Sequence, residues 1–129
     1  MNKITTYADA IKEALKLSIK RDKKVILLGL GVDDPKGIFG TTKEIHKFFP
    51  KNVFDMPTAE NGFTGFALGL AVSGFRPVIV HQRVEFSLLS IEQIFNQIAK
   101  WNYMSAGSVS VPMVIRLIIG NVVSICIIM

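Results

Sequence analysis

The stretch Asp55-Met-Pro-Thr-Ala-Glu60-Asn-Gly-Phe-Thr-Gly-Phe-Ala-Leu-Gly69 decides how this sequence is interpreted. It places one carboxylate, Glu60, where a short apolar strand passes into a helix that contains several glycines. The residues that follow are largely apolar, so this acid is expected to be shielded from water. Acids in such surroundings gather at functional sites. A simpler interpretation is that Glu60 opens the helix and favours its positive N-terminus. The position of Glu60 in the sequence is compatible with both the functional and the helix-opening interpretation.

Short apolar runs alternate with helical patterns along the whole chain. Strands are predicted over residues 25–28, 53–56, 77–80 and 111–119, and helices over residues 6–21, 41–49, 60–73 and 88–104, with Thr6 capping the first and Thr41 or Thr42 the second. The last helix is predicted to turn inward Leu88, Ile91, Ile94, Phe95, Ile98 and Trp101. This alternation predicts one doubly wound α/β domain, with a mostly parallel sheet and helices on both faces.

Charge is distributed very unevenly between the two halves of the chain. The net charge is +5, but residues 61–129 hold only 4 basic and 2 acidic side chains. A domain of 129 residues must present much of its surface to its surroundings, and so few charges cover little of it. We therefore expect a buried protein interface, in an obligate oligomer or with a companion chain.

The remaining charges and the single cysteine exclude several classes of function. Lysines cluster on and just after the first helix without interleaved aromatic residues, which indicates a solvated helix face rather than a nucleic-acid site. Arg116 lies within the apolar C-terminal stretch and argues against a membrane anchor. Cys126 is the only cysteine, so no internal disulfide forms. This fits a reducing compartment, the cytoplasm or the mitochondrial matrix in a eukaryote.

Other chemistries have weak support in the sequence. His46 and His81 lack the spacing of a zinc site, and Cys126 reads as a small core hydrophobe. The segment from Gly29 to Gly31 is only half of a dinucleotide fingerprint. By composition alone, Phe86 is expected in the core. Glu60 therefore remains the strongest candidate.

Four segments carry a family resemblance: VILLGLGV, the long FDMPTAENGFTGFALGLAVSGFRPVIVHQRVEFSLLSIEQIFNQIAKWNYMSAG, VPMVIR and the LIIG that follows it. Together they resemble the β subunit of the thiamine-diphosphate-dependent component of 2-oxo-acid dehydrogenase complexes. The similarity spans roughly residues 4–120, the pyrimidine-binding domain shared with transketolases. The long segment is the specific part, because it joins the acid, the glycine-containing helix, Gly-x-Arg-Pro and a Gln-x-x-Asn-x-x-Ala-Lys helix.

The resemblance implies a role for particular residues. Glu60 matches the glutamate that hydrogen-bonds a ring nitrogen of the cofactor's aminopyrimidine and favours its imino tautomer. Phe86 matches the aromatic residue that packs on that ring, and Gln82 lies near the same pocket. Met113 follows Pro112 where the family can offer a backbone carbonyl to a potassium ion. The implied partners are an α subunit that holds the diphosphate and magnesium, a second β subunit and a 2-oxo acid, with neither nucleic acid nor membrane.

The chain also departs from the family's pattern. After the equivalent of Gly120, relatives continue with a glycine-rich stretch, a His-Ser-Gln motif and a C-terminal domain. Here residues 121–129 form a divergent apolar tail, which predicts a truncated domain over residues 1–120. Three interpretations stay open: a subunit for oxidative decarboxylation of a 2-oxo acid that is inactive alone, a non-catalytic fragment or docking module, and a transketolase-type carboligase.

Overall fold

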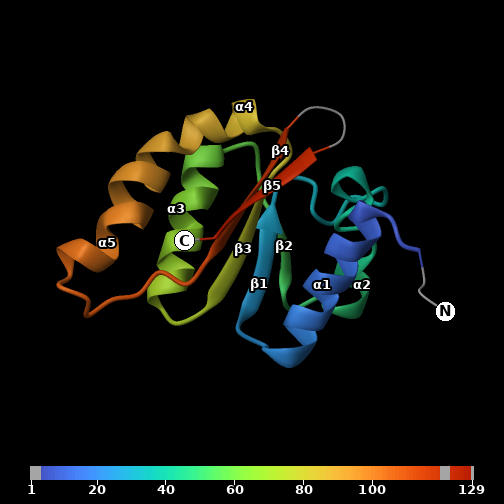
Figure 1. Ribbon diagram of the computed structural model, residues 1–129, viewed down its shortest axis with the longest axis horizontal. Coiled ribbons are helices and arrows are strands. Elements are labelled where there is room, and N and C mark those ends of the chain that lie inside the picture. The colour runs from blue at the N-terminus through green and yellow to red at the C-terminus, as the bar shows by residue number, and fades with distance from the viewer. Residues whose placement is uncertain (1–3, 120–122, 129) are drawn as a thin grey trace.

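The computed structural model describes residues 4–119 and 123–128, and a five-stranded sheet forms its centre (Figure 1). The strands are β1 Val25–Gly29, β2 Val53–Asp55, β3 Arg76–His81, β4 Val114–Ile119 and β5 Val123–Ile128, in the spatial order β2-β1-β3-β4-β5. The pairs β1–β2, β1–β3 and β3–β4 are parallel, whereas β5 runs antiparallel to β4. The prediction of a mostly parallel α/β sheet is therefore confirmed.

Helices cover both faces of the sheet. Figure 1 shows α1 Tyr7–Arg21 and α2 Ile45–Phe48 on one side of the strands, and α3 Glu60–Val72 with the helical run that follows β3 on the other. Strand β1 is buried along its whole length, as expected when both faces are covered.

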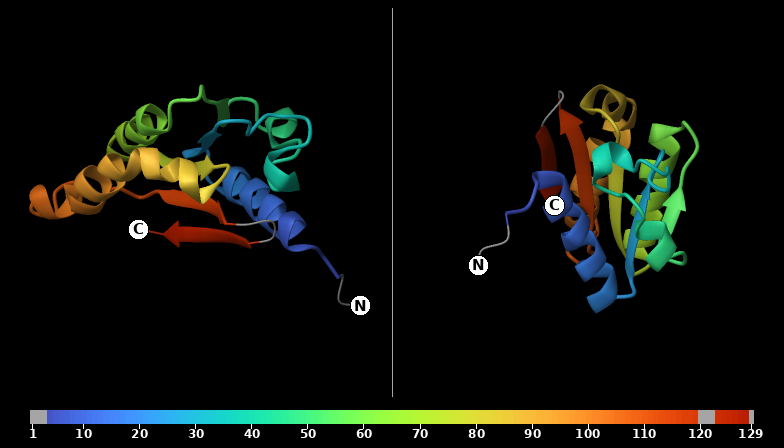
Figure 2. Two further views of the ribbon diagram at one scale, coloured as in Figure 1. Left: turned by 90° about the horizontal axis from the view of Figure 1, so that it is seen from above. Right: turned by 90° about the vertical axis from the view of Figure 1, so that its right-hand side faces the viewer.

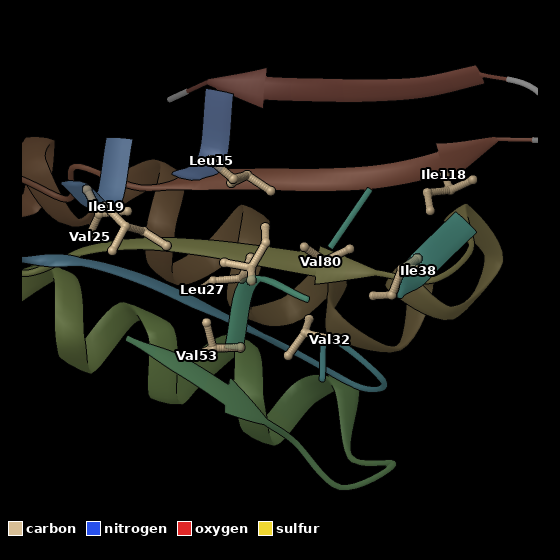
Figure 3. Packing of buried hydrophobic residues seen from close by; sticks show 10 residues of the cluster. Leu15, Ile19, Val25, Leu27, Val32, Ile38, Val53, Val80 and Ile118 are labelled. Carbon is tan, nitrogen blue, oxygen red and sulfur yellow. The ribbon is translucent and has the colours of Figure 1, made fainter. Parts of the chain in front are cut away.

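Two separate cores result from the alternation of side chains along each strand. Leu27 of β1 packs in the cluster beneath α1, together with Leu15 and Ile19 of that helix (Figure 3). Its neighbours Ile26 and Leu28 point to the opposite face and join the cluster beneath α3. Sheet and helices are thus held together by two apolar layers, one on each face.

The start of the first helix follows the sequence pattern. The Thr6 hydroxyl oxygen accepts a hydrogen bond from the backbone N–H of Asp9 at 3.1 Å, which caps α1. The lysines of α1 find local partners: Lys12 pairs with Asp9 at 2.6 Å and Lys16 with Glu13 at 3.4 Å. This confirms the predicted helix and its N-cap.

The predicted cap of the second helix is wrong. α2 begins only at Ile45, and the residue before it, Glu44, has a left-handed conformation and makes no side-chain cap. Thr42 instead accepts from the backbone N–H of Ile38, while Thr41 donates to the Ile38 carbonyl and accepts from the Arg116 guanidinium. Both threonines hold the preceding turn together, because buried hydroxyl groups need partners there.

The single helix predicted over residues 88–104 is three short segments, and a fourth, α4, precedes them. They are α4 Val84–Ser87, the 3₁₀ turn η2 Leu88–Ser90, the π-helix η3 Glu92–Ile98 and α5 Ala99–Met104. Ile98 is buried, and Ile94 and Trp101 pack on the core as predicted, but Leu88, Ile91 and Phe95 are exposed. A π-helix has a wider turn than an α-helix, so a face assigned with the period 3.6 is rotated away from the core.

The C-terminal part of the sheet also differs from prediction. β4 begins at Val114, three residues after the predicted start, and β5 occupies most of the stretch described above as a divergent tail (Figure 2). The rest of that stretch, residues 121, 122 and 129, lies outside the described part of the chain. Within the described residues, no helix is both long and apolar enough to cross a membrane.

Candidate functional site

The candidate site lies where the strand order reverses. The chain moves from β1 outward to β2 and then crosses through α3 to β3 on the other side of β1, so β1 and β3 flank a topological switch point. In open α/β sheets, ligands bind beyond the carboxyl ends of the strands at such a point. Here those ends lead into Leu30 after β1 and Gln82 after β3.

Glu60 is both a helix opener and a buried acid. It is the first residue of α3, next to the positive end of the helix dipole, and only 7% of its surface is exposed. Within the described part of the chain, its carboxyl group accepts no side-chain hydrogen bond and forms no ion pair. A buried carboxyl group whose hydrogen-bonding capacity is unused is suited to receive a ligand.

The three residues predicted for the cofactor site come together in the structure. One small cavity, of about 10 Å³, is lined by Glu60, Gln82 and Phe86 together with Leu30, Phe63, Val80 and His81. These residues come from the end of β1, the start of α3, the end of β3 and α4. The fold therefore brings together, beyond the carboxyl ends of the strands, residues that lie far apart in the sequence.

Phe86 lies on α4 at the rim of this cavity. It is 39% exposed, so the expectation from composition that it belongs to the core is wrong. The Arg83 guanidinium carbon lies 5.9 Å from the centre of the ring, within range of a cation–π contact. One face of a partly exposed ring can pack on a flat ligand, which is what the resemblance implies.

Gln82 connects the cavity to the loop that follows β1. Its side-chain amide donates to the Leu30 carbonyl at 3.0 Å. A Cβ atom on Gly31 would lie 2.8 Å from the same amide nitrogen, and the φ of +76° at this residue favours glycine there. A second, open cavity of about 410 Å³ is also lined by Gln82, together with the turn that contains Gly37 and Ile38.

Asp55 organises the same loop, a role that sequence reasoning missed. Its carboxylate accepts from the backbone N–H groups of Gly31 at 2.5 Å and Val32 at 3.1 Å. These two hydrogen bonds tie the end of β2 to the turn after β1. The sequence signal was an aspartate at the carboxyl end of a strand, beside a glycine-containing loop at the end of its neighbour.

His81 is the second residue that the sequence did not assign to the site. It is 2% exposed at the end of β3, and its ring centre lies 5.0 Å from that of Phe63. Burial lowers the pKa of the imidazole from its usual 6.5 to about 4, against the opposing effect of the nearby Glu60 charge. His81 is therefore neutral at pH 7, beside the carboxyl group.

Met113 is not part of this cavity. It is buried immediately before β4 and lines a different hollow with Arg76 and Pro77, at the amino end of β3. Met113 lies at the amino ends of the strands and Glu60 beyond their carboxyl ends, so the two residues are at opposite ends of the sheet. In the described residues, no group of three or more His, Cys, Asp or Glu side chains is arranged to hold a metal ion.

Comparison with known proteins identifies the fold family. Residues 3–121 match the family described as the transketolase pyrimidine-binding domain. The chain is 41% identical over 117 residues to a mitochondrial pyruvate dehydrogenase E1 component subunit beta of Pisum sativum, covering 90% of this chain and 33% of that protein. A mitochondrial subunit beta of Caenorhabditis elegans is 42% identical over 112 residues, covering 86% and 32%.

A bacterial relative shows the same pattern. The pyruvate dehydrogenase E1 component subunit beta of Staphylococcus epidermidis is 40% identical over 117 residues, covering 90% of this chain and 36% of that protein. The chain thus spans about a third of the length of the curated relatives it matches. With its switch-point site and a match over nearly its whole length, the chain belongs to the transketolase pyrimidine-binding domain family.

Proposed function

We propose that this chain supplies the aminopyrimidine-binding half of a thiamine diphosphate site, in a β-type subunit that takes part in oxidative decarboxylation of a 2-oxo acid. The observation that carries the proposal is the convergence of Glu60, Phe86 and Gln82 on one cavity at the switch point. The relatives, named as pyruvate dehydrogenase E1 beta subunits, support the reaction class.

The donor set fits an aminopyrimidine ring. Such a ring offers nitrogen atoms at its edge and an aromatic face, and the site offers a carboxyl group without a partner in the described chain and a partly exposed phenyl ring. Glu60 would hydrogen-bond a ring nitrogen, and Phe86 would pack on the ring, a contact worth about 1 kcal/mol beyond area burial. Gln82 would fix the wall of the site through its bond to Leu30.

The protein's part in the reaction is to orient the ring and share a proton with it. The apolar side chains of Phe63, Val80 and Leu30 line the cavity beside Glu60, and a carboxyl group at this position would share a proton with a ring nitrogen of the bound cofactor. When bound, the cofactor supplies the nucleophilic carbon that adds to the 2-oxo group.

A partner chain would complete the site. The cavity beside Glu60 is far smaller than a coenzyme, and the helical run after β3 leaves its apolar side chains uncovered: Phe86, Leu88, Leu89, Ile91, Phe95, Tyr103 and Met104 are all exposed. We assign this run to an interface with an α-type subunit, which would hold the diphosphate and its magnesium ion, and with a second copy of the β-type chain.

Two finer assignments belong to the same proposal. The backbone carbonyl of Met113 would serve as one ligand of a structural potassium ion, with the other ligands outside this chain. The compartment would be the cytoplasm, or the mitochondrial matrix in a eukaryote, as the names of the plant and nematode relatives suggest for their own location.

Calorimetry with thiamine diphosphate and Mg²⁺ tests the proposal. The full chain is co-expressed with an α-type subunit and compared as wild type, Glu60→Gln and the exposed control Glu13→Gln. Loss of the hydrogen bond between Glu60 and the ring predicts binding weaker by about tenfold for Glu60→Gln and unchanged binding for the control. Equal affinity for wild type and Glu60→Gln would remove Glu60 from the site.

A further inference from the structure

His81 is a buried polar group that the proposed function does not yet use. Among the described residues, its Nδ1 atom is buried without a hydrogen-bond partner. Leaving such an atom unpaired costs about 1–3 kcal/mol, so an unpaired nitrogen beside a cavity indicates that something occupies the cavity. The ring itself lines the cavity that contains Glu60.

The hydrogen bonds behind the ring determine what Nδ1 can bind. The Nε2 atom lies 3.4 Å from the Thr64 hydroxyl oxygen, and Thr64 donates its one hydrogen to the Ser90 hydroxyl at 3.0 Å. With Thr64 as the donor to Ser90, its oxygen accepts from the ring and the imidazole proton is on Nε2, the tautomer that the NMR experiment below tests. The remaining nitrogen, Nδ1, carries a lone pair and can accept a hydrogen bond.

The size of the cavity limits the occupant to one small molecule. Its volume of about 10 Å³ is close to the minimum for a single water, and a buried water needs two to four polar partners. Three polar residues of the lining can supply them: Glu60, His81 and Gln82. Phe63, Leu30 and Val80 make the rest of the wall apolar.

We propose that His81 is a positioning residue for Glu60, acting through one water that donates a hydrogen bond to Nδ1 and another to the carboxyl group. The carboxyl group is then connected through His81 to Thr64 and Ser90, which anchor it to α3 and η2. The bridge holds the acid in one orientation before a ligand arrives. Its catalytic relevance rests on the proposed role of Glu60, whereas its existence does not.

Nitrogen NMR of the full chain labelled with ¹⁵N-histidine tests the bridge without any cofactor. The chain has only two histidines, and His46, whose Nδ1 is also buried without a partner in the described chain, is the internal control. We expect His81 at pH 7 to be neutral with its proton on Nε2. Its Nδ1 resonance should move in Glu60→Gln while both His46 resonances stay. A proton on Nδ1 would overturn the proposal, and so would an Nδ1 chemical shift that is the same in wild type and Glu60→Gln.

Three substitutions separate positioning from packing in the cofactor-binding assay. His81→Asn puts an amide near the place of Nδ1, His81→Gln puts one near the place of Nε2, and His81→Phe keeps only the ring. Loss of one hydrogen bond predicts thiamine diphosphate affinity about tenfold weaker for the glutamine and phenylalanine variants, with asparagine close to wild type. Equal loss in all three, or rescue by glutamine instead, would contradict the positioning role.

The two experiments fail independently. If wild-type chain with its α-type subunit binds no thiamine diphosphate, the proposed function falls. The NMR result on the chain alone still decides whether His81 and Glu60 are coupled.

Discussion

The two faces of the sheet are built for different purposes. On the α1 side, Lys12 and Lys16 pair with acids on the surface of the helix, and the buried amide of Asn52 donates to the carbonyls of Lys23 and Val25, both at 2.9 Å. On the α3 side, Glu60 and His81 are buried and line one cavity, and the His81 Nδ1 atom has no hydrogen-bond partner in the described chain. The difference teaches that the first face mainly stabilises the domain, while the second carries a cavity suited to binding. The cavity makes the difference, because His46 on α2 also has a buried Nδ1 without a partner in the described chain.

Apolar surface shows the same contrast. The core beneath α1 includes fully buried residues such as Leu27, Val32 and Ile45, whereas the helical run on the other face exposes Leu89 and Phe95 by 63% and 60%. Burial contributes stability only where side chains leave water. The run packs on the core through Ile94, Ile98 and Trp101, whereas its exposed side chains contribute little to folding and are available to a partner.

The largest expected effect comes from a substitution in the core of the first face, beneath α1. Leu27 is fully buried in β1, so Leu27→Ala removes buried methyl groups and leaves a cavity. We expect the free energy of unfolding to fall by about 2–5 kcal/mol. Urea unfolding followed by circular dichroism measures it, with the exposed Leu17→Ala as control. A loss as small as that of the control would show that this face is not the stabilising one.

Acid should destabilise the second face through His81. The unfolded chain takes up a proton near pH 6.5, but the folded chain does so only near pH 4, so unfolding is favoured as the pH falls between these values. Stability is fully present above pH 6.5, and this residue lowers it by about 3 kcal/mol by pH 4. Urea unfolding of wild type and His81→Phe from pH 7 to pH 4 isolates this contribution. Parallel curves would contradict it.

Asn52 offers a smaller test of the first face. Asn52→Ala leaves the carbonyls of Lys23 and Val25 without their donor, which we expect to cost about 2 kcal/mol of stability. Thermal or urea unfolding detects the change. Asn52→Asp keeps the shape but removes the donor, so it should be at least as destabilising. A neutral Asn52→Asp variant would count against the hydrogen bonds as the cause.

The smallest effect on stability is expected on the exposed run. Phe95→Ser should change the free energy of unfolding by less than about 0.5 kcal/mol, because a surface substitution disturbs no packed group. The same variant should weaken co-purification with an α-type subunit. Lys100→Ser, one turn away on the exposed surface of α5, is the control. Normal assembly of Phe95→Ser would remove this run from the proposed interface.

Much of the fold was predictable because local patterns agreed with it. The apolar run from Val25 to Leu28 became a strand buried on both faces, and Thr6 capped α1 through Asp9. The burial of Glu60 followed from the apolar residues around it. In these places, neighbouring residues in the sequence are sufficient to determine the structure.

Other features depend on contacts between distant segments. Thr41 and Thr42 lost their predicted role as caps because Arg116 and the turn at Ile38 compete for their hydroxyl groups. The period of 3.6 residues that identifies an α-helix does not predict the π-helix η3. The role of His81 depends on Thr64, which lies 17 residues away in the sequence. No local sequence pattern predicts that contact.

The central claim is that Glu60 meets the edge of a pyrimidine ring inside a shielded cavity. The most direct measurement is a crystal structure of the full chain assembled with its α-type subunit, thiamine diphosphate and Mg²⁺. A Glu60 carboxyl oxygen within about 3 Å of a ring nitrogen, with Phe86 against the ring face, is the predicted result. A cofactor bound elsewhere, or a Glu60 side chain turned into solvent, would contradict the account.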